Sequence, residues 1–138
     1  MKRGWMIFGI VVAVVVIVIG CYKWPVRLTK MNTSEVGLIV LQDGTTGNRV
    51  EISDTETIEK VMGQFHSIKM RRGKLSAGYG GYHIWVRVCK PDMEIVSDFT
   101  VSGKGYIRKD PFFYTISEGT IDVEYLEQLI VEAQNTEE

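Results

Sequence analysis

The stretch YHIWVRVC, residues 82–89, alternates apolar side chains with polar or bulky ones. Such an alternation is typical of a β-strand with one buried face, because successive side chains point to opposite faces of a sheet. Lys90-Pro-Asp92 then marks a turn, and Ile95 to Val101 repeats the alternation. Two alternating runs joined by a short turn predict an antiparallel hairpin at the centre of the fold.

Further strands and a final helix follow this hairpin. Tyr106 to Arg108 and Phe112 to Ser117 predict two short strands on either side of Asp110-Pro111. Asp122 is typical of a helix N-cap, and apolar residues recur after it at helical spacing with glutamates between them. We therefore expect an antiparallel meander that ends in an acidic, amphipathic helix.

The residues before residue 82 predict a second hairpin and a first helix. Val36 to Leu41 is a short apolar run, and Val50 to Ile52 resumes the strand pattern after a turn rich in Gly, Asp and Asn. Ser53-Asp-Thr-Glu56 has the form of a capping box, in which Ser or Asp accepts from the first free amides. A helix from about Asp54 to His66 follows from four apolar residues at the spacing of one helical face: Ile58, Val61, Met62 and Phe65.

These elements together predict an α+β domain. We expect an antiparallel sheet of five to seven short strands, with two helices packed on one face. The domain would occupy residues 35–135, with 136–138 as a tail. Residues 25–34 hold turn formers without periodicity, and we expect them to be a linker.

Residues 1–24 predict a signal anchor or transmembrane helix. From Trp5 to Tyr22 the chain carries no charged residue. This segment has 18 residues. A helix of that length, at about 1.5 Å per residue, spans roughly 27 Å, which is close to the thickness of a bilayer's hydrocarbon core. Trp5 at one end, with Tyr22 and Trp24 at the other, matches the aromatic belts found at membrane interfaces.

Cys21 leaves three alternatives open for this segment. The span could stay as an uncleaved anchor, or Val18-Ile-Gly-Cys21 could act as a lipoprotein signal in which Cys21 is lipidated. Ordinary secretion with release fits less well, because no Ala-x-Ala cleavage pattern is present. Basic residues lie on both sides of the span, Lys2 and Arg3 before it and Lys23, Arg27 and Lys30 after it, so the positive-inside rule is nearly balanced. Because a short N-terminus followed by a domain usually stays inside, we expect a single-pass protein of the plasma membrane whose C-terminal domain is extracytoplasmic.

Charge and cysteine content exclude several classes of protein. Of the 138 residues, 16 are Lys or Arg and 17 are Asp or Glu. Because three basic residues but no acidic ones precede Pro25, the domain is net negative, which argues against a nucleic-acid partner. Cys89 is the one cysteine after the span, so the domain has no internal disulfide. His66, His83 and Cys89 lack the spacing of a zinc site, and the sequence predicts no metal or cofactor.

Two short segments are candidates for binding. Lys69, Arg71, Arg72 and Lys74 place four cations within six residues, which predicts a surface for anionic lipid headgroups, an anionic polymer or a protein partner. The alternative is a solvated strand or loop. Tyr79 and Tyr82 lie in a Gly-rich segment that predicts a mobile recognition loop. The alternative there is a hairpin turn with Tyr82 packed.

No arrangement of nucleophile, base and orienting group is visible, so the sequence predicts a protein that is not an enzyme. An enzyme that uses dispersed residues such as His83, Asp98 and Asp110 is the weaker alternative. An accessory subunit of a transporter or sensor kinase, with the span as its interface, is another. The leading interpretation is a membrane-tethered extracytoplasmic module that binds or senses something at the cell envelope, its partners being membrane lipid and an envelope protein or anionic polymer.

The order of these parts resembles a group of uncharacterised small single-span proteins of Gram-positive bacteria, many from gut clostridia. The resemblance is carried by the basic start, the span, the Trp-Pro-basic exit, Ile52-Ser-Asp-Thr-Glu-Thr-Ile-Glu-Lys-Val61 and the later Tyr114-Thr-Ile116 strand before an acidic helix. It implies a membrane-anchored extracytoplasmic domain with this topology, and it implies no catalytic residue.

Overall fold

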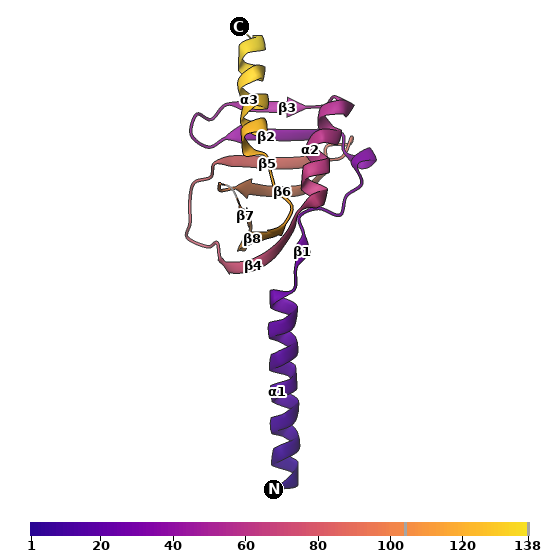
Figure 1. Cartoon of the computed structure of the whole chain (residues 1–138), viewed down its shortest axis with the longest axis vertical. Helices are drawn as coiled ribbons and strands as arrows, with labels where there is room; N and C mark the ends of the chain where they lie inside the picture. The colour runs from indigo at the N-terminus through magenta and orange to yellow at the C-terminus, as the bar shows by residue number, and fades with distance from the viewer. Residues whose placement is uncertain (104, 138) are drawn as a thin grey trace.

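The computed structural model describes residues 1–103 and 105–137, which form one long helix followed by an α+β domain (Figure 1). The elements occur in the order α1 (Lys2–Lys23), β1 (Val26–Arg27), a short 3₁₀ helix η1 (Thr33–Glu35), β2 (Leu38–Asp43), β3 (Arg49–Ile52), α2 (Thr55–Ser67), β4 (Lys69–Leu75), β5 (Ile84–Cys89), β6 (Ile95–Val101), β7 (Tyr106–Lys109), β8 (Phe112–Glu118) and α3 (Val123–Glu137).

Helix α1 extends away from the domain, and none of its residues is buried (Figure 1). It is the one helix of the described chain that is long and apolar enough to cross a membrane, and a signal sequence would have the same properties. The opposite end of the molecule carries the C-terminal end of α3 (Figure 1). The domain therefore has one end, next to Lys23, that adjoins the apolar helix.

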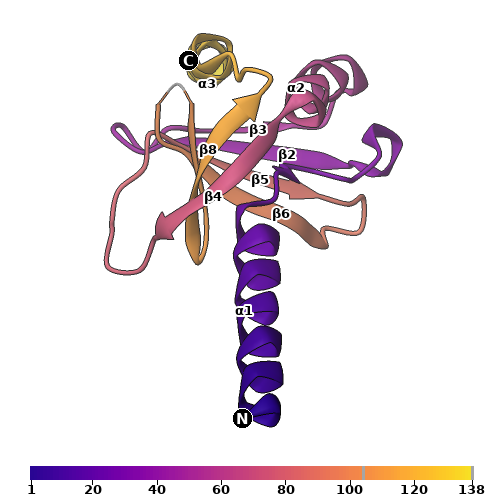
Figure 2. The same cartoon turned by 60° about the horizontal axis from the view of Figure 1, so that its bottom comes forward.

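A single antiparallel sheet forms the body of the domain, with strand order β1-β4-β8-β7-β6-β5-β2-β3. The sheet has eight strands, so the expected five to seven was too few. It is strongly twisted, and β4 and β8 cross the direction of β2 and β5 (Figure 2). Strands β1 and β3 are the two edges, and the sheet stays open.

The two additional strands come from segments whose sequence pattern does not indicate a strand. Residues 25–34, expected as a linker, contain β1, and Leu28 and Met31 of this segment are buried in the core. The basic segment from Lys69 to Leu75 is β4, which pairs with β8 along its length but with β1 only at Lys69 and Met70. Both strands form because other strands of the sheet supply hydrogen-bond partners for their backbone. The spacing of side chains within a segment gives no information about such partners.

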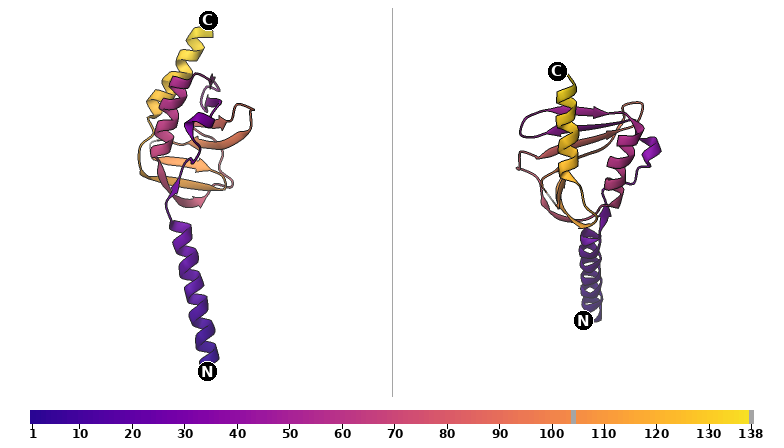
Figure 3. Two further views of the ribbon diagram at one scale, coloured as in Figure 1. Left: turned by 90° about the vertical axis from the view of Figure 1, so that its right-hand side faces the viewer. Right: turned by 45° about the horizontal axis from the view of Figure 1, so that its top comes forward.

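Helices α2 and α3 lie on the same face of the sheet (Figure 3). The predicted stripe of α2 is confirmed, since all four of its apolar residues are buried, and Phe65 stacks edge-on against Phe99 of β6 at 5.3 Å. Helix α3 buries Val123, Leu126 and Ile130 and lies over β2 and β3. The opposite face of the sheet carries no helix. Most side chains on that face are exposed or half-buried, but Val40 of β2, between two core residues, is buried there.

The expected helix starts are present in the structure. The Asp54 carboxylate accepts a hydrogen bond from the Thr57 amide at 2.9 Å, so Asp54 rather than Ser53 caps α2. The Asp122 carboxylate accepts from the Tyr125 amide at 3.0 Å at the start of α3. Helix α3 continues to Glu137, into the residues expected as a tail.

Candidate functional site

The four basic residues predicted as one surface all lie on β4, but they have different surroundings. Lys69 Nζ lies 3.1 Å from a Glu118 carboxylate oxygen. The Arg71 side chain is exposed and makes no ion pair within the part of the chain that the structure describes. Arg72 and Lys74 each lie over aromatic rings, and these rings belong to different clusters. The structure therefore does not bring the four cations into one patch.

An irregularity in β4 accounts for this separation. The register between β4 and β8 shifts between Arg72 and Leu75. A bulge of this kind turns side chains that follow it toward the other face of a sheet. Arg72 lies over Phe112, whereas Lys74 lies over Phe113, the next residue along β8.

Arg72 belongs to a contact between α1 and the domain, which we call the Tyr22 joint: Tyr22, Arg72, Gly73 and Phe112. The Tyr22 hydroxyl donates to the Gly73 carbonyl oxygen at 2.7 Å, and its ring stands edge-on to Phe112 with centroids 5.8 Å apart. The Arg72 guanidinium lies 5.5 Å from the Tyr22 ring centroid and 5.1 Å from that of Phe112. These contacts attach the end of α1 to β4, beyond the point where β1 stops pairing with it.

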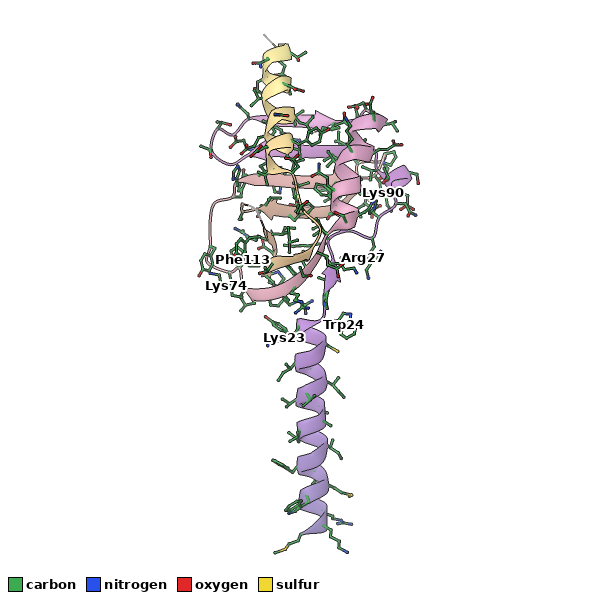
Figure 4. All side chains as sticks on the ribbon, viewed as in Figure 1. Lys23, Trp24, Arg27, Lys74, Lys90 and Phe113 are labelled. Carbon is green, nitrogen blue, oxygen red and sulfur yellow. The ribbon has the colours of Figure 1, made fainter. Side chains whose placement is uncertain are left out.

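Lys74 lies beside a cavity of about 510 Å³, which we call the Lys74 hollow. Its Nζ atom lies 4.4 Å from the Tyr79 ring centroid and 5.4 Å from that of Phe113, and it donates to the Tyr79 hydroxyl at 3.2 Å. Figure 4 shows Lys74 and Phe113 together on the part of the domain nearest to α1. The complete lining is Gly73, Lys74, Tyr79, Ser102, Tyr106, Phe113 and Thr115.

Hydrogen bonds at the start of the Gly-rich loop position Tyr79. The Ser76 hydroxyl donates to Asp110 Oδ1 at 2.6 Å, and the Arg108 guanidinium donates both to Asp110 and to the Tyr79 carbonyl oxygen, each at 3.0 Å. The hydrogen bond from Ser76, followed by that from Arg108, holds the pKa of the Asp110 carboxyl below its ordinary value. Tyr79 and Phe113 then meet edge-on at 5.3 Å, so the aromatic wall of the hollow is built from β8 and an anchored loop.

Tyr82 lines a second cavity of about 500 Å³. Tyr79, Ser102 and Phe113 line both cavities. The Tyr82 backbone lies so close to Gly44 that a Cβ atom there would be 1.8 Å from the Tyr82 carbonyl oxygen. The two predicted recognition residues thus lie next to adjoining hollows, and the base of their loop is held at Gly44.

The residues weighed as a dispersed catalytic set have separate partners. His83 Nε2 contacts Glu127 Oε1, while Asp98 accepts from the Trp85 indole and the Arg87 guanidinium. Asp110 is bound by Ser76 and Arg108, as described above. No hydrogen bond in the described residues joins two of these three, and no group of three His, Cys, Asp or Glu side chains in that part of the chain is placed to hold a metal ion.

The two cysteines have contrasting surroundings. Cys21 is exposed on the last turn of α1, and Cys89 is buried in β5 with 3% of its surface exposed. Lipidation of Cys21 stays a prediction. Cys89 packs as a small residue in the sheet.

We compared the chain with family models, curated proteins and solved structures, and none of them matches. Three further residues of the Lys74 hollow, Ser102, Tyr106 and Phe113, are not evident as site residues from the sequence. A usable signal was the Phe112-Phe-Tyr114 run on a strand: since side chains alternate, one ring must face away from its two neighbours. Phe113 is that ring, whereas Tyr114 is buried in the core.

Proposed function

We propose that this chain is a membrane-tethered, non-enzymatic binding module. It would hold an anionic polymer of the cell envelope near the outer face of the plasma membrane. In this proposal α1 is the anchor and the domain is extracytoplasmic. The contact between α1 and β4 supports a domain whose Lys74 hollow stays within reach of the membrane.

The observation that carries the proposal is the position of the Lys74 ammonium group beside two aromatic rings at the edge of a hollow. An ammonium group has three donors, and only one of them is used by the Tyr79 hydroxyl. The other two are available to a carboxylate or phosphate, and charge-assisted hydrogen bonds of this kind are the stronger class. Tyr79, Tyr106 and Phe113 supply flat apolar surface beside that charge.

These features fit a repeating ligand with ring faces and acidic groups, such as an acidic glycan. The aromatic rings would cover the apolar face of a sugar ring while Lys74 binds its acidic group. The cavity volume of about 510 Å³ lies within the range of small-molecule sites, so a short segment of polymer would fill it.

The test is binding of the full chain, reconstituted in nanodiscs of neutral phosphatidylcholine, to soluble polymers. Polygalacturonate and poly(glycerol phosphate) are the anionic probes, and dextran is the neutral one. Lys74→Gln should weaken binding of the preferred anionic probe about tenfold to a hundredfold, since a hydrogen bond to a charged group contributes roughly 1.5–3 kcal/mol.

Lys60→Gln is the matched control, because Lys60 is exposed on α2 and its substitution removes the same charge far from the hollow. Equal binding by both variants, or equal binding of dextran and the anionic probes, would contradict the proposal. Selective loss on Lys74→Gln supports it.

The Tyr22 joint favours one second candidate, an accessory subunit of a transporter or sensor kinase. Because Tyr22 on α1 touches β4 directly, a ligand in the domain has a physical route to the span. Scrambling the apolar residues before Gly20 while keeping Tyr22 discriminates between the two. An accessory subunit would lose its cross-linked membrane partner, whereas a binding module would keep its polymer affinity.

A further inference from the structure

A third hollow, distinct from the Lys74 hollow and from the cavity beside Tyr82, is lined by cations from separate parts of the chain. We call it the basic hollow: Arg27, Lys30, Lys90 and Lys109 line a cavity of about 460 Å³. Arg27 lies on β1, Lys30 follows it, Lys90 begins the turn after β5, and Lys109 ends β7. Only the tertiary structure brings these four residues together.

Backbone contacts hold the segment that carries Arg27 and Lys30. The Leu28 amide donates to the Ile68 carbonyl oxygen at 3.2 Å, and the Leu28 side chain is buried. His66 Nε2 lies 2.6 Å from the Met31 carbonyl oxygen. One wall of the basic hollow is therefore held by hydrogen bonds to α2 and to the residue that follows it.

The turn that carries Lys90 is held just as closely. The Gly37 amide donates to the Cys89 carbonyl oxygen at 2.9 Å. A Cβ atom on Gly37 would lie 2.5 Å from Pro91 Cα, so only glycine permits this approach. The Lys90 ammonium group is thereby brought to the same cavity as the cations of the β1 segment.

Charge within the basic hollow is incompletely balanced. Glu35 lines it, and Glu94 lies 3.3 Å from Lys90 Nζ. Among the described residues, Arg27, Lys30 and Lys109 form no ion pair. Several cations held around one cavity repel one another, and an anion with more than one oxygen would relieve that repulsion.

Ser97 provides an independent observation that points to a ligand in the basic hollow. It lies in the wall of the basic hollow and is 5% exposed. Its hydroxyl oxygen is buried and has no hydrogen-bond partner among the described residues. A buried hydroxyl without a partner is uncommon in native structures, whereas a phosphate oxygen in the hollow would be a suitable acceptor.

The basic hollow lies close to the end of the apolar helix. Trp24 follows α1 in an extended conformation, and Arg27 comes three residues later. Figure 4 shows Arg27 just above Lys23 and Trp24, with Lys90 farther into the domain. Three extended residues rise roughly 10 Å, and the headgroup layer is about 5–8 Å thick on each side, so the mouth of the hollow adjoins that layer.

We propose that the basic hollow is a binding site for the phosphate of an anionic phospholipid headgroup. Arg27 and Lys30, which lie nearest the membrane, would bind the phosphate from the membrane side, and Lys90, Lys109 and Ser97 would bind the oxygen atoms that reach farther into the hollow. This site is independent of the Lys74 hollow, which has its own lining residues. Its occupant would set how the domain lies on the membrane.

Retention of lipid by the full chain tests the proposal. The protein in neutral detergent is titrated with short-chain phosphatidylglycerol or phosphatidylcholine, and bound lipid is counted by native mass spectrometry. Lys30→Gln with Lys109→Gln should weaken phosphatidylglycerol binding about thirtyfold, or about fivefold for each cation. Lys60→Gln with Lys74→Gln removes the same charge elsewhere and should leave lipid binding unchanged while affecting the polymer site.

Equal phosphatidylglycerol binding by both double variants would overturn the proposal, and so would equal binding of phosphatidylcholine by the unsubstituted chain. Glycerol 1-phosphate is the soluble competitor. If glycerol 1-phosphate displaces phosphatidylglycerol when the two are present at equal concentration, the hollow binds free phosphate compounds, and the assignment to a lipid is overturned.

A second measurement needs no variant and therefore does not depend on folding of substituted chains. In nanodiscs containing phosphatidylglycerol, acetylation of Lys30 and Lys109 should be at least about fivefold slower than in phosphatidylcholine alone, whereas Lys60 should react equally in both. Equal rates at Lys109 in the two lipids would overturn the proposal.

Discussion

Substitution of Tyr22 tests whether the domain is held in one orientation relative to α1. Tyr22 makes three contacts across the joint: a hydrogen bond to Gly73, an edge-on contact with Phe112 and a cation–π contact with Arg72. Tyr22→Phe removes the hydrogen bond and keeps the ring. Tyr22→Ala removes all three contacts.

The expected loss of free energy at the joint follows from these three contacts. A net hydrogen bond contributes roughly 0.5–1.5 kcal/mol, an edge-on aromatic pair a similar amount, and an exposed cation–π contact about 0.5–1 kcal/mol. Tyr22→Phe should therefore weaken the joint by about 1 kcal/mol and Tyr22→Ala by about 2–4 kcal/mol. The latter corresponds to a roughly thirtyfold to thousandfold shift toward the detached state.

Spin-label distance measurements can follow this shift. One label is placed on Cys21, which is exposed, and the other on an introduced Glu59→Cys on α2; Cys89 is buried and should stay unlabelled. We expect a narrow distance distribution in the parent chain, slight broadening for Tyr22→Phe and a broad distribution for Tyr22→Ala. A narrow distribution in Tyr22→Ala would refute the reasoning, and Tyr106→Ala, which alters an exposed ring outside the joint, is the control.

Two further predictions concern the domain itself. Phe65→Ala should lower the free energy of unfolding by about 3–5 kcal/mol in urea denaturation, because the ring is fully buried and stacks on Phe99; a loss under 1 kcal/mol would contradict the packing described here. Asp110 has a lowered pKa in the folded chain, chiefly through the Ser76 hydroxyl, so its contribution to stability is present above its ordinary pKa near 4 and is lost as the pH falls through the lowered value. Asp110→Asn should therefore reduce the loss of stability between pH 7 and pH 3, and an unchanged pH profile would contradict this assignment.

Local sequence patterns identified most of the secondary structure for a definite reason. Helix α2 and strands β5 and β6 each bury chiefly one face, so each carries its own periodicity, whereas β2 buries Ile39, Val40 and Leu41 in succession and is marked by a continuous apolar run. The caps Asp54 and Asp122 act on amides three residues away. Such features depend on neighbours along the chain, and these are visible in a sequence.

Strands β1 and β4 show no local sequence pattern of this kind, neither an alternation of apolar residues nor a continuous apolar run. β1 has two residues, and β4 buries only Met70 along a run of basic side chains. Their pairing with each other and with β8 depends on residues far along the chain. The register shift between Arg72 and Leu75 depends on β8 in the same way.

The sequence by itself determined the apolar helix, the α+β class, the helix caps and the two segments that hold Lys74 and Tyr79, because each of these follows from side-chain spacing or from contacts within a few residues. Only the tertiary structure decided that Lys74 meets Phe113, that Arg72 meets Tyr22, and that Arg27, Lys30, Lys90 and Lys109 surround one cavity. Those groupings arise from strand register, from a bulge and from the close approach of Gly37 to Pro91. Register and close approach are properties of residues distant in sequence, so no local pattern encodes them.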